Sequence, residues 1–502
     1  MVEIHIDRSS SVPVYLQIDR TLRSLIASGE LPEGTLLPPE RRLAAQLGVN
    51  RTTVLNAYRE LKTDGLVESH VGSGTRVAGR TEGELRTAVE PLPWNQLLGG
   101  GGERVEDPLV RDLLELTERR DVISLAVGLP APELLPLDTV DTLQRSLTTR
   151  VGAGVLLHSP TEGLSPFRET LCGIMAARGV TCGVPEVLVT SGSQQGVDLL
   201  ARVLLDPGDE VVVEEPSYFG ALQVFRRARA RLVGVPVDGE GMRTDVLETV
   251  LKRRRPKLIY TLPTFQNPSS AVLTLARRWH LLELAYRFQV PVIEDDVYSE
   301  LRYEGAPLPS LRALDVHGHV IYVSSFSKVL FPGLRVGWLV APPPLLRQLA
   351  LAKQSVDLHT TTPGQWLIHH FIRDGHYGRH VAVARRAYRE RRDVMDQALR
   401  ASAPRTLRWA HPEGGFYFWC SFPASVSQTR LLGLAAAEGV AYLPGETCFV
   451  GEVTTNTMRL NFSFPTPDRI RAGVAGLMKA LRRAAQEPWA GVHGAGGTPP
   501  IV

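Results

Sequence analysis

The chain has 502 residues, of which 43% are hydrophobic and 22% are charged, and its formal net charge is +3. Such values are typical of a globular protein of two or three domains, and a charge so near neutral does not identify a partner. Four scattered cysteines without a CxxC pair argue against a disulfide framework and structural zinc, so we expect a reducing cytoplasm and no metal. No signal peptide and no run of 18 apolar residues is present, so we expect no membrane span.

The sequence predicts three zones and a tail. Residues 1–78 contain short helical patterns and a glycine-rich turn. Residues 79–107 include four consecutive glycines, Gly99 to Gly102, and are predicted to be a flexible linker. Residues 108–486 alternate short apolar runs with helical segments, which predicts an α/β domain with a mainly parallel sheet. The Gly/Pro-rich residues 487–502 are predicted to be a disordered tail.

The first zone predicts three helices. Apolar residues at helical spacing define the first helix, which Gly29 can end: Val14, Ile18, Leu22, Leu25 and Ile26. A second helix is expected from Pro39 to Gly48. After a short turn, Asn50 is placed to cap a third helix that ends near Gly65. Two helices joined by a tight glycine turn are typical of a helix-turn-helix motif.

The third helix would open with residues that can read DNA. Arg51, Thr52 and Thr53 occupy its first turn, where recognition helices reach base edges. Arg41 and Arg42 lie near the turn, where phosphates would pass. Residues 1–78 nevertheless contain nine Lys/Arg and nine Asp/Glu, so a structural role or a protein-binding module remains an alternative on these patterns alone.

Residues 37–77, LPPERRLAAQLGVNRTTVLNAYRELKTDGLVESHVGSGTRV, resemble the GntR-type winged helix-turn-helix family. The resemblance implies DNA binding. It assigns a backbone- and base-contacting role to Arg41 and the recognition role to Arg51, Thr52 and Thr53. Gly72, in the turn between the two wing strands, would then be the tip of the wing.

Lys328 follows the apolar run VIYVSS and stands among small hydroxyl residues, Ser325 and Ser327. Most lysines are solvated surface charges. A lysine directly after a buried strand, however, loses charge by desolvation and becomes a nucleophile toward a carbonyl group. This indicates a carbonyl cofactor, and pyridoxal phosphate (PLP) is the common one.

PLP makes demands on the rest of the chain that the sequence can meet. Its ring nitrogen needs a carboxylate, which Asp295 or Asp296 could supply at the end of the run VPVIEDD. Tyr298 and Asn267 could donate to the 3′-oxygen, and Tyr218 could cover the face of the ring.

The phosphate needs hydrogen-bond donors and positive charge. The segment VLVTSGSQQGVDLL predicts a strand, a turn and a helix start, whose backbone N–H groups would face an anion. The candidates for the phosphate are Gly192, Ser193, Gln194, Ser325, Ser327 and Arg335.

Seven segments in the order SGSQQ, PSY, QNP, DDVY, SFSK, GLR and MRLNFS resemble fold type I aminotransferases over residues 110–485. The resemblance implies a large and a small subdomain and a covalent imine between PLP and Lys328. It assigns Asp295 to the ring nitrogen, Tyr298 to the 3′-oxygen and Arg459 to the α-carboxylate of an amino acid. His158 stands where the family has a tyrosine that reaches the phosphate of the neighbouring subunit.

A GntR-type domain followed by an aminotransferase-like domain resembles the MocR/GabR regulators. The resemblance implies a homodimeric, PLP-dependent transcription regulator that binds operator DNA and a small amino-compound effector. The alternatives are a catalytically active aminotransferase with an accessory DNA-binding domain, a regulator whose effector is PLP itself, and an empty fold without cofactor.

Overall fold

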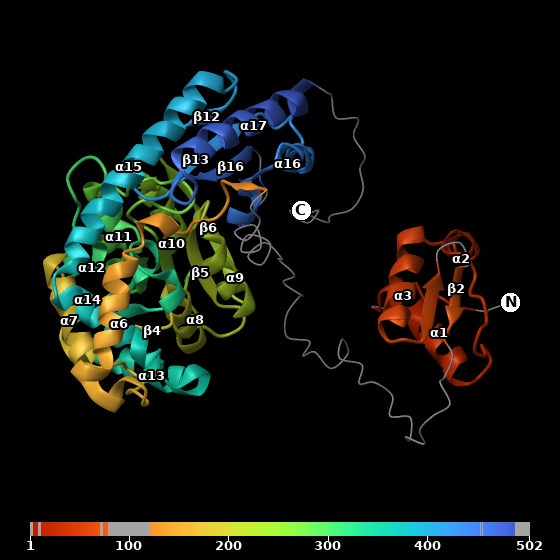
Figure 1. The fold of residues 1–502 in the computed structure, drawn as a ribbon, viewed down its shortest axis with the longest axis horizontal. Coiled ribbons are helices and arrows are strands. Elements are labelled where there is room, and N and C mark those ends of the chain that lie inside the picture. The colour runs from red at the N-terminus through yellow and green to blue at the C-terminus, as the bar shows by residue number, and fades with distance from the viewer. Residues whose placement is uncertain are drawn as a thin grey trace. The chain divides into compact units, whose positions relative to one another are not determined.

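The computed structural model describes residues 4–8, 12–70, 74–78, 121–451, 453 and 455–486. The chain divides into two units, Met1–Gly101 and Gly102–Val502, and each is described here by itself (Figure 1). The boundary lies within the predicted linker 79–107. That linker and the predicted tail 487–502 fall outside the described residues, so both stay predictions.

The first unit is a three-helix domain with a two-stranded wing. Its elements are α1 (Val14–Ala27), α2 (Glu40–Leu47), α3 (Arg51–Thr63), β1 (Val67–His70) and β2 (Gly74–Val77). Gly48 ends α2 in the left-handed region at φ +64°, which a residue with a side chain rarely adopts. The Asn50 side chain then accepts a hydrogen bond from the Thr52 N–H at 3.0 Å and caps α3. The predicted helix-turn-helix and the Asn50 cap are confirmed, although α2 begins one residue after Pro39.

One small core holds this unit together. Side chains from all three helices and both strands are buried in it: Ile18, Leu22, Leu43, Val54, Ala57, Tyr58, Leu61, Val67 and Val77. The Tyr58 hydroxyl donates to the Pro38 carbonyl at 2.7 Å, which fixes α3 against the chain that enters α2. The core and this hydrogen bond therefore fix the orientation of α3 relative to α2 and the wing.

An eight-stranded sheet forms the centre of the second unit, in the order β4-β11-β10-β9-β8-β5-β6-β7. Its strands are β4 (Val187–Thr190), β5 (Glu210–Glu215), β6 (Arg231–Asp238), β7 (Gly241–Met242), β8 (Leu258–Thr261), β9 (Val292–Asp295), β10 (Val320–Ser325) and β11 (Gly337–Val340). The central pairs from β10 to β6 are parallel, and β11 runs antiparallel between β10 and β4. The predicted, mainly parallel α/β sheet is confirmed.

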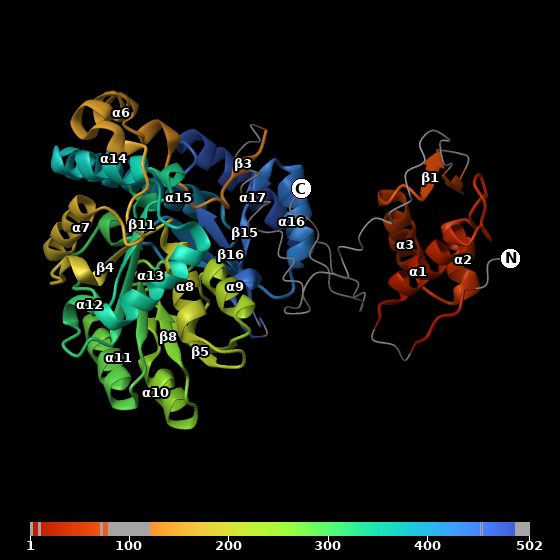
Figure 2. The same cartoon turned by 90° about the horizontal axis from the view of Figure 1, so that it is seen from below.

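Helices cover both faces of this sheet because its central strands are apolar on both sides. The side chains of Val211 and Val213 face one core and that of Val212 faces the other. The first face is covered by α8 (Ser193–Leu204), α9 (Phe219–Arg227) and α13 (Pro343–Asp357) (Figure 2). The second face is covered by α10 (Thr244–Arg253), α11 (Leu275–Phe288) and α12 (Leu311–Leu314).

A second, smaller subdomain is built on the antiparallel sheet β12-β13-β16-β15. Its strands are β12 (Arg408–Trp409), β13 (Tyr417–Phe422), β15 (Leu443–Pro444) and β16 (Asn456–Asn461), and the short β3 (Ile123–Ser124) pairs with β14 (Val440–Ala441). The helices α15 (His376–Ser402), α16 (Gln428–Ala437) and α17 (Pro467–Gln486) lie beside it (Figure 1). The remaining α-helices of the described residues are α6 (Leu137–Val151), α7 (Ser165–Ala177) and α14 (Thr362–Arg373). The large and small subdomains expected from the resemblance are therefore present.

The topology brings several candidate residues to one edge of the large sheet. Strands β4, β5, β8, β9 and β10 all run in the same direction, so their carboxyl ends lie on the same edge. In doubly wound sheets, ligands bind at this edge. Among the described residues we find no helix that is long and apolar enough to cross a membrane.

Gly337 opens β11 where two backbone segments meet. A Cβ atom on Gly337 would lie 2.7 Å from the Ser324 carbonyl oxygen and 2.8 Å from the Gly192 carbonyl carbon. We therefore predict that Gly337→Ala lowers the free energy of unfolding by about 1–3 kcal/mol, because backbone cannot move aside as a side chain can. The control is Gly333→Ala, since nothing lies within 4 Å of a Cβ there. Equal midpoints of urea unfolding for the two variants would contradict this packing.

Candidate functional site

Lys328 ends a short 3₁₀ turn, Phe326–Lys328, directly after β10. The Ser325 hydroxyl begins this turn by accepting a hydrogen bond from the Ser327 N–H at 3.0 Å. The Lys328 ammonium donates to the Gly128 carbonyl at 2.8 Å, and no carboxylate of the described residues forms an ion pair with it. Burial lowers the pKa of Lys328, and the charge of Arg459 adds to this shift while Tyr417 and Asp295 oppose it. The amine is thereby prepared to act as a nucleophile.

Asp295 is the last residue of β9 and is 4% exposed. One oxygen, Oδ2, accepts from the Tyr260 hydroxyl at 2.7 Å, whereas the buried Oδ1 has no hydrogen-bond partner. Burial raises the pKa of Asp295 to about 6, although the hydrogen bond from Tyr260 opposes this. Unpaired buried oxygens are rare in native proteins, so Oδ1 is suited to a cationic donor supplied by a ligand.

Asp296, the alternative acid, is already engaged. Its Oδ2 accepts from the Tyr322 hydroxyl at 2.7 Å, and its Oδ1 accepts from the Ser299 N–H at 3.2 Å. Both oxygens therefore have protein partners. This difference favours Asp295 over Asp296 as the carboxylate for a ring nitrogen.

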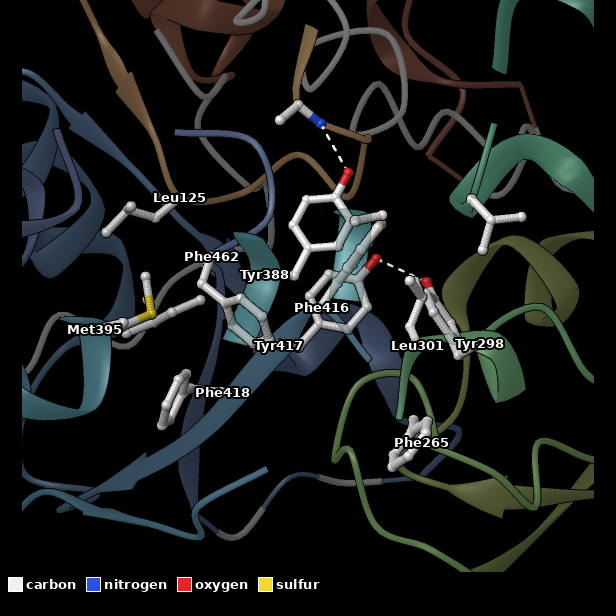
Figure 3. Close-up of a cluster of buried hydrophobic side chains, with 14 of the residues drawn as sticks. Leu125, Phe265, Tyr298, Leu301, Tyr388, Met395, Phe416, Tyr417, Phe418 and Phe462 are labelled. Carbon is white, nitrogen blue, oxygen red and sulfur yellow. Dashed lines mark hydrogen bonds between the residues drawn. The ribbon is translucent and has the colours of Figure 1, made fainter. Parts of the chain in front are cut away.

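Tyr298 and Tyr417 face each other across the site, and their hydroxyl oxygens are 3.0 Å apart (Figure 3). Both side chains are almost fully buried. Burial raises the pKa of Tyr298 well above its ordinary value. For Tyr417 the positive charges of Arg459 and Lys328 outweigh burial, so its pKa is lowered. The pair therefore offers a hydroxyl hydrogen-bond donor within the pocket that holds Lys328.

Arg459 of β16 is 2% exposed and is near enough to Lys328 for its charge to lower the pKa of that lysine. Its guanidinium carbon is 4.1 Å from the centre of the Tyr417 ring. Nη1 donates to the Asn267 side-chain oxygen at 2.8 Å, Nη2 donates to the Ala126 carbonyl at 2.9 Å, and Nε has no partner. No carboxylate of the described residues pairs with this buried cation. The site thus has a place for an anionic group from a ligand.

Several residues predicted to bind the phosphate lie close together where β4 runs into α8. Gly192 precedes the helix at φ +88°, and a Cβ there would lie 2.5 Å from Nη2 of Arg335. Arg335 donates to the Ser191 carbonyl at 3.1 Å and to the Ser327 hydroxyl at 3.4 Å. The first turn of α8, with Ser193, therefore lies beside a guanidinium and a hydroxyl, which is the arrangement of an anion site at a helix N-terminus.

Three other predicted residues lie at the border of this cluster. The Gln194 side chain donates to the Gly220 carbonyl at 2.8 Å and so ties α8 to α9. Tyr218 follows β5 and is near enough to Asp295 for that charge, after burial, to raise the pKa of its hydroxyl. His158 is exposed, and its Nδ1 lies 2.8 Å from Nε2 of His359.

Sequence analysis missed several groups that the fold adds to the site. Tyr417, Tyr260 and the carbonyls of Ala126 and Gly128 contact the predicted residues. Residues 126–128 come from a segment that carries no motif, and Tyr260 is one apolar-looking residue of a buried strand. Only the aromatic-rich run GGFYFW around Tyr417 was a signal that could have been followed.

In the first unit, the predicted DNA contacts lie in the first turns of two helices, Arg41 and Arg42 in α2 and Arg51, Thr52 and Thr53 in α3. Arg41, Arg42, Arg51 and Thr52 are exposed, and Thr53 is half-buried. Both Nε and Nη2 of Arg51 lie 2.9 Å from Oε2 of Glu40, so this arginine is held by an ion pair. Gly72 falls outside the described residues. The exposure of these side chains leaves them accessible to DNA, and their contacts with it stay a prediction.

Comparisons with known proteins agree with both units. Residues 120–477 match the family model "Aminotransferase class I and II", and residues 14–77 match "Bacterial regulatory proteins, gntR family". The chain is 32% identical to the uncharacterized HTH-type transcriptional regulator YisV of Bacillus subtilis, covering 95% of this chain and 97% of YisV. It is 30% identical to the probable rhizopine catabolism regulatory protein MocR of Rhizobium meliloti, over 95% of each chain.

Among solved structures, the second unit is similar to α-aminoadipate aminotransferase of Thermus thermophilus, complexed with N-(5′-phosphopyridoxyl)-L-leucine. The TM-score is 0.74 at 38% identity, and the match covers 79% of this chain and all of that one. The chain therefore belongs to the aminotransferase class I and II family and joins a GntR-type DNA-binding domain to an aminotransferase-like domain, as in the MocR regulators.

Proposed function

We propose that this protein is a transcription regulator that binds operator DNA through its first unit and senses an amino-group effector through PLP in its second unit. The observation that carries the proposal is a pair of unsatisfied groups at the carboxyl edge of the sheet. The Lys328 amine has no carboxylate partner among the described residues, and the buried Oδ1 of Asp295 has no hydrogen-bond partner there. An aldehyde and a protonated ring nitrogen would satisfy these two groups.

PLP is the cofactor of the aminotransferase-like domain, and the residues present fit it. Lys328 would hold its aldehyde, Asp295 its ring nitrogen, and Tyr298 with Asn267 its 3′-oxygen. Tyr218 would cover one face of the ring. The phosphate would lie at the α8 N-terminus, bound by Gly192, Ser193, Gln194, Ser325, Ser327 and Arg335. When bound, the cofactor withdraws electrons from an attached amine.

Arg459 supports an effector that carries a carboxylate as well as an amine. Its guanidinium is buried, is oriented by Asn267 and Ala126, and has an unpaired Nε. An α-amino acid matches this arrangement, because its carboxylate would meet Arg459 while its amine meets the cofactor.

Contacts of the site with residues 126–128 support coupling to the rest of the chain. Gly128 accepts from Lys328, and Ala126 accepts from Arg459. These carbonyls belong to the start of the second unit, shortly after the segment that leads from the first. An effector that displaces Lys328 and engages Arg459 changes both contacts at once, which gives the differential binding that a switch requires.

Regulation and transamination are distinguishable candidates. Lys328, Asp295 and Arg459 would also permit turnover, so an amino donor and a keto acid should be tested with the full chain. The DNA-binding unit and the full-length relatives with regulator names favour sensing. Steady turnover at the rate of an enzyme would favour the alternative, an aminotransferase with an accessory DNA-binding domain.

A head-to-tail homodimer forms part of the proposal. Leu156 is 79% exposed and Leu157 is 63% exposed, and they directly precede the exposed His158. Exposing two adjacent leucine side chains to water is unfavourable, and a second copy of the chain would bury them. The same contact would bring His158 toward the phosphate of the neighbouring subunit, where the family has a tyrosine.

Lys328→Ala should abolish the visible absorption band of lysine-bound PLP, because the chain loses the amine that binds the aldehyde. In the wild-type chain, borohydride reduction followed by peptide mass spectrometry should find the adduct on Lys328. Lys353, which is fully buried, is the internal control. An adduct on Lys353, or no adduct, would refute the assignment.

Asp295→Asn should weaken PLP binding roughly 100-fold, since it removes the buried charge that pairs with the ring nitrogen. The wild-type affinity should fall as the pH drops through about 6, where Asp295 becomes protonated in the cofactor-free protein. The folded-state pKa is raised, so protonation stabilises the cofactor-free fold at low pH and this contribution is lost as the pH rises through 6. The variant should therefore be no less stable at pH 8.

The matched control for Asp295→Asn is Asp296→Asn, whose carboxylate is hydrogen-bonded at both oxygens. In PLP titrations over pH 5–8, followed by absorbance, this control should keep the affinity of the wild type at pH 8. Its loss of affinity should begin at a lower pH than in the wild type, because the charge of Asp296 no longer raises the pKa of Asp295. A wild-type pH profile for Asp295→Asn would exclude Asp295 as the partner of the ring nitrogen.

Arg51→Ala should weaken specific DNA binding by about 1–3 kcal/mol, because Arg51 would contact a base edge. The probe is a duplex selected from a random pool by the wild-type chain, and binding is measured by fluorescence anisotropy. Arg59→Ala is the control, since Arg59 is also exposed on α3 but lies two turns further along. Unchanged affinity of the Arg51 variant would count against the recognition role.

A further inference from the structure

Lys353 of α13 is completely buried, which is rare for a lysine. Its ammonium donates to both carboxylate oxygens of Asp357, at 2.7 and 2.8 Å, and to the side-chain oxygen of Gln195 at 3.0 Å. Burial lowers the pKa of Lys353, and the hydrogen bond to Asp357 opposes this shift. Asp357 is half-buried, and burying a charged lysine against it gains little stability compared with apolar packing, so another reason is needed for a lysine at this position.

That reason lies in the other contacts of Asp357. Its Oδ2 accepts from the Ser191 hydroxyl at 2.9 Å and from the Gln195 side-chain amide at 2.7 Å. The Gln195 side-chain oxygen in turn accepts from the Ser191 N–H at 2.7 Å. Ser191 and Gln195 flank Gly192, so one carboxylate fixes both sides of the turn that opens α8.

We propose that Asp357 is a positioning residue for the cofactor's phosphate, and that Lys353 is present to neutralise it. This inference rests on the proposed PLP site. Asp357 holds Ser191 and Gln195 so that the first N–H groups of α8 converge on one point. Arg335 joins the same turn through the Ser191 carbonyl, at 3.1 Å. Neither Lys353 nor Asp357 touches the ligand in this arrangement.

Charge explains why the two residues occur together. A carboxylate near a phosphate dianion repels it, and the buried ammonium of Lys353 cancels that repulsion. The four-residue spacing on α13 places the ammonium against both oxygens of Asp357, including Oδ2, which also accepts from Ser191. Asp357 can therefore accept hydrogen bonds from the turn without adding net negative charge to the cradle.

The experiment compares two ligands that differ only in the phosphate. The full chain is freed of cofactor and titrated with PLP and with pyridoxal, which has the aldehyde and ring nitrogen but no phosphate. For Asp357→Asn we expect the PLP dissociation constant to rise at least tenfold and the pyridoxal constant to change less than twofold. Circular dichroism and thermal melting check that the variant is folded.

Two further variants test the roles separately. Ser191→Ala removes one donor to Asp357 and should give a smaller loss that is also confined to PLP, even if Asp357→Asn folds poorly. Lys353→Met leaves Asp357 uncompensated and should weaken PLP binding more than Lys353→Met/Asp357→Asn does, because the double variant has no unpaired charge.

The matched control is Asp198→Asn. It breaks an exposed ion pair further along α8, in which Asp198 and Arg202 are 2.6 Å apart. Both dissociation constants should stay at the wild-type value. Equal losses for PLP and pyridoxal in Asp357→Asn and Ser191→Ala would assign the network a general structural role and overturn the proposal, as would no loss for either ligand. If the wild-type chain binds neither ligand, the proposed function itself fails.

Discussion

The chemistry of this protein depends on how an amine and a carboxyl group are held away from water in one pocket. Burial disfavours the charged form of each, so the pKa of Lys328 falls and that of Asp295 rises to about 6. The charged form of each group is therefore less stable than it would be in water, and one oxygen of Asp295 lacks a hydrogen-bond partner. A ligand that brings an aldehyde and a protonated nitrogen satisfies both, and the unfavourable burial becomes a preference for that ligand.

Much of this site could be predicted from sequence because the fold imposes a simple geometry. Lys328, Asp295 and Gly192 each follow a short apolar run, and carboxyl ends of parallel strands meet at one edge. Periodicity was equally informative in the first unit, where the glycine turn at Gly48 and the Asn50 cap follow from local backbone preferences. Such features are encoded within a few residues, so one sequence displays them.

Other features depend on tertiary contacts that no local pattern records. The Tyr298 and Tyr417 hydroxyls meet although 119 residues separate them, and Lys328 reaches a carbonyl 200 residues earlier. The ion pair of Arg51 with Glu40 joins two helices across the turn, and the local sequence around either residue does not predict the other as its partner. The choice of Asp295 over Asp296 rested on resemblance, whereas the structure supplies a physical reason in the hydrogen bonds that already occupy Asp296.

The charged residues around the proposed PLP site are of two kinds, those with an ion-pair partner and those without one. We assign the paired residues to fixing the site and the unpaired ones to sensing a ligand. Lys353 and Asp357 neutralise each other, so their network can fix a turn whether or not a ligand is bound. Lys328 and Arg459 have no ion-pair partner among the described residues, and both donate to carbonyls of residues 126–128. In the proposed function, their surroundings therefore change when an effector with an amine and a carboxylate binds. A buried cation with only carbonyl acceptors is stabilised by such a ligand far more than a paired one, which makes this segment the part of the pocket best suited to report occupancy.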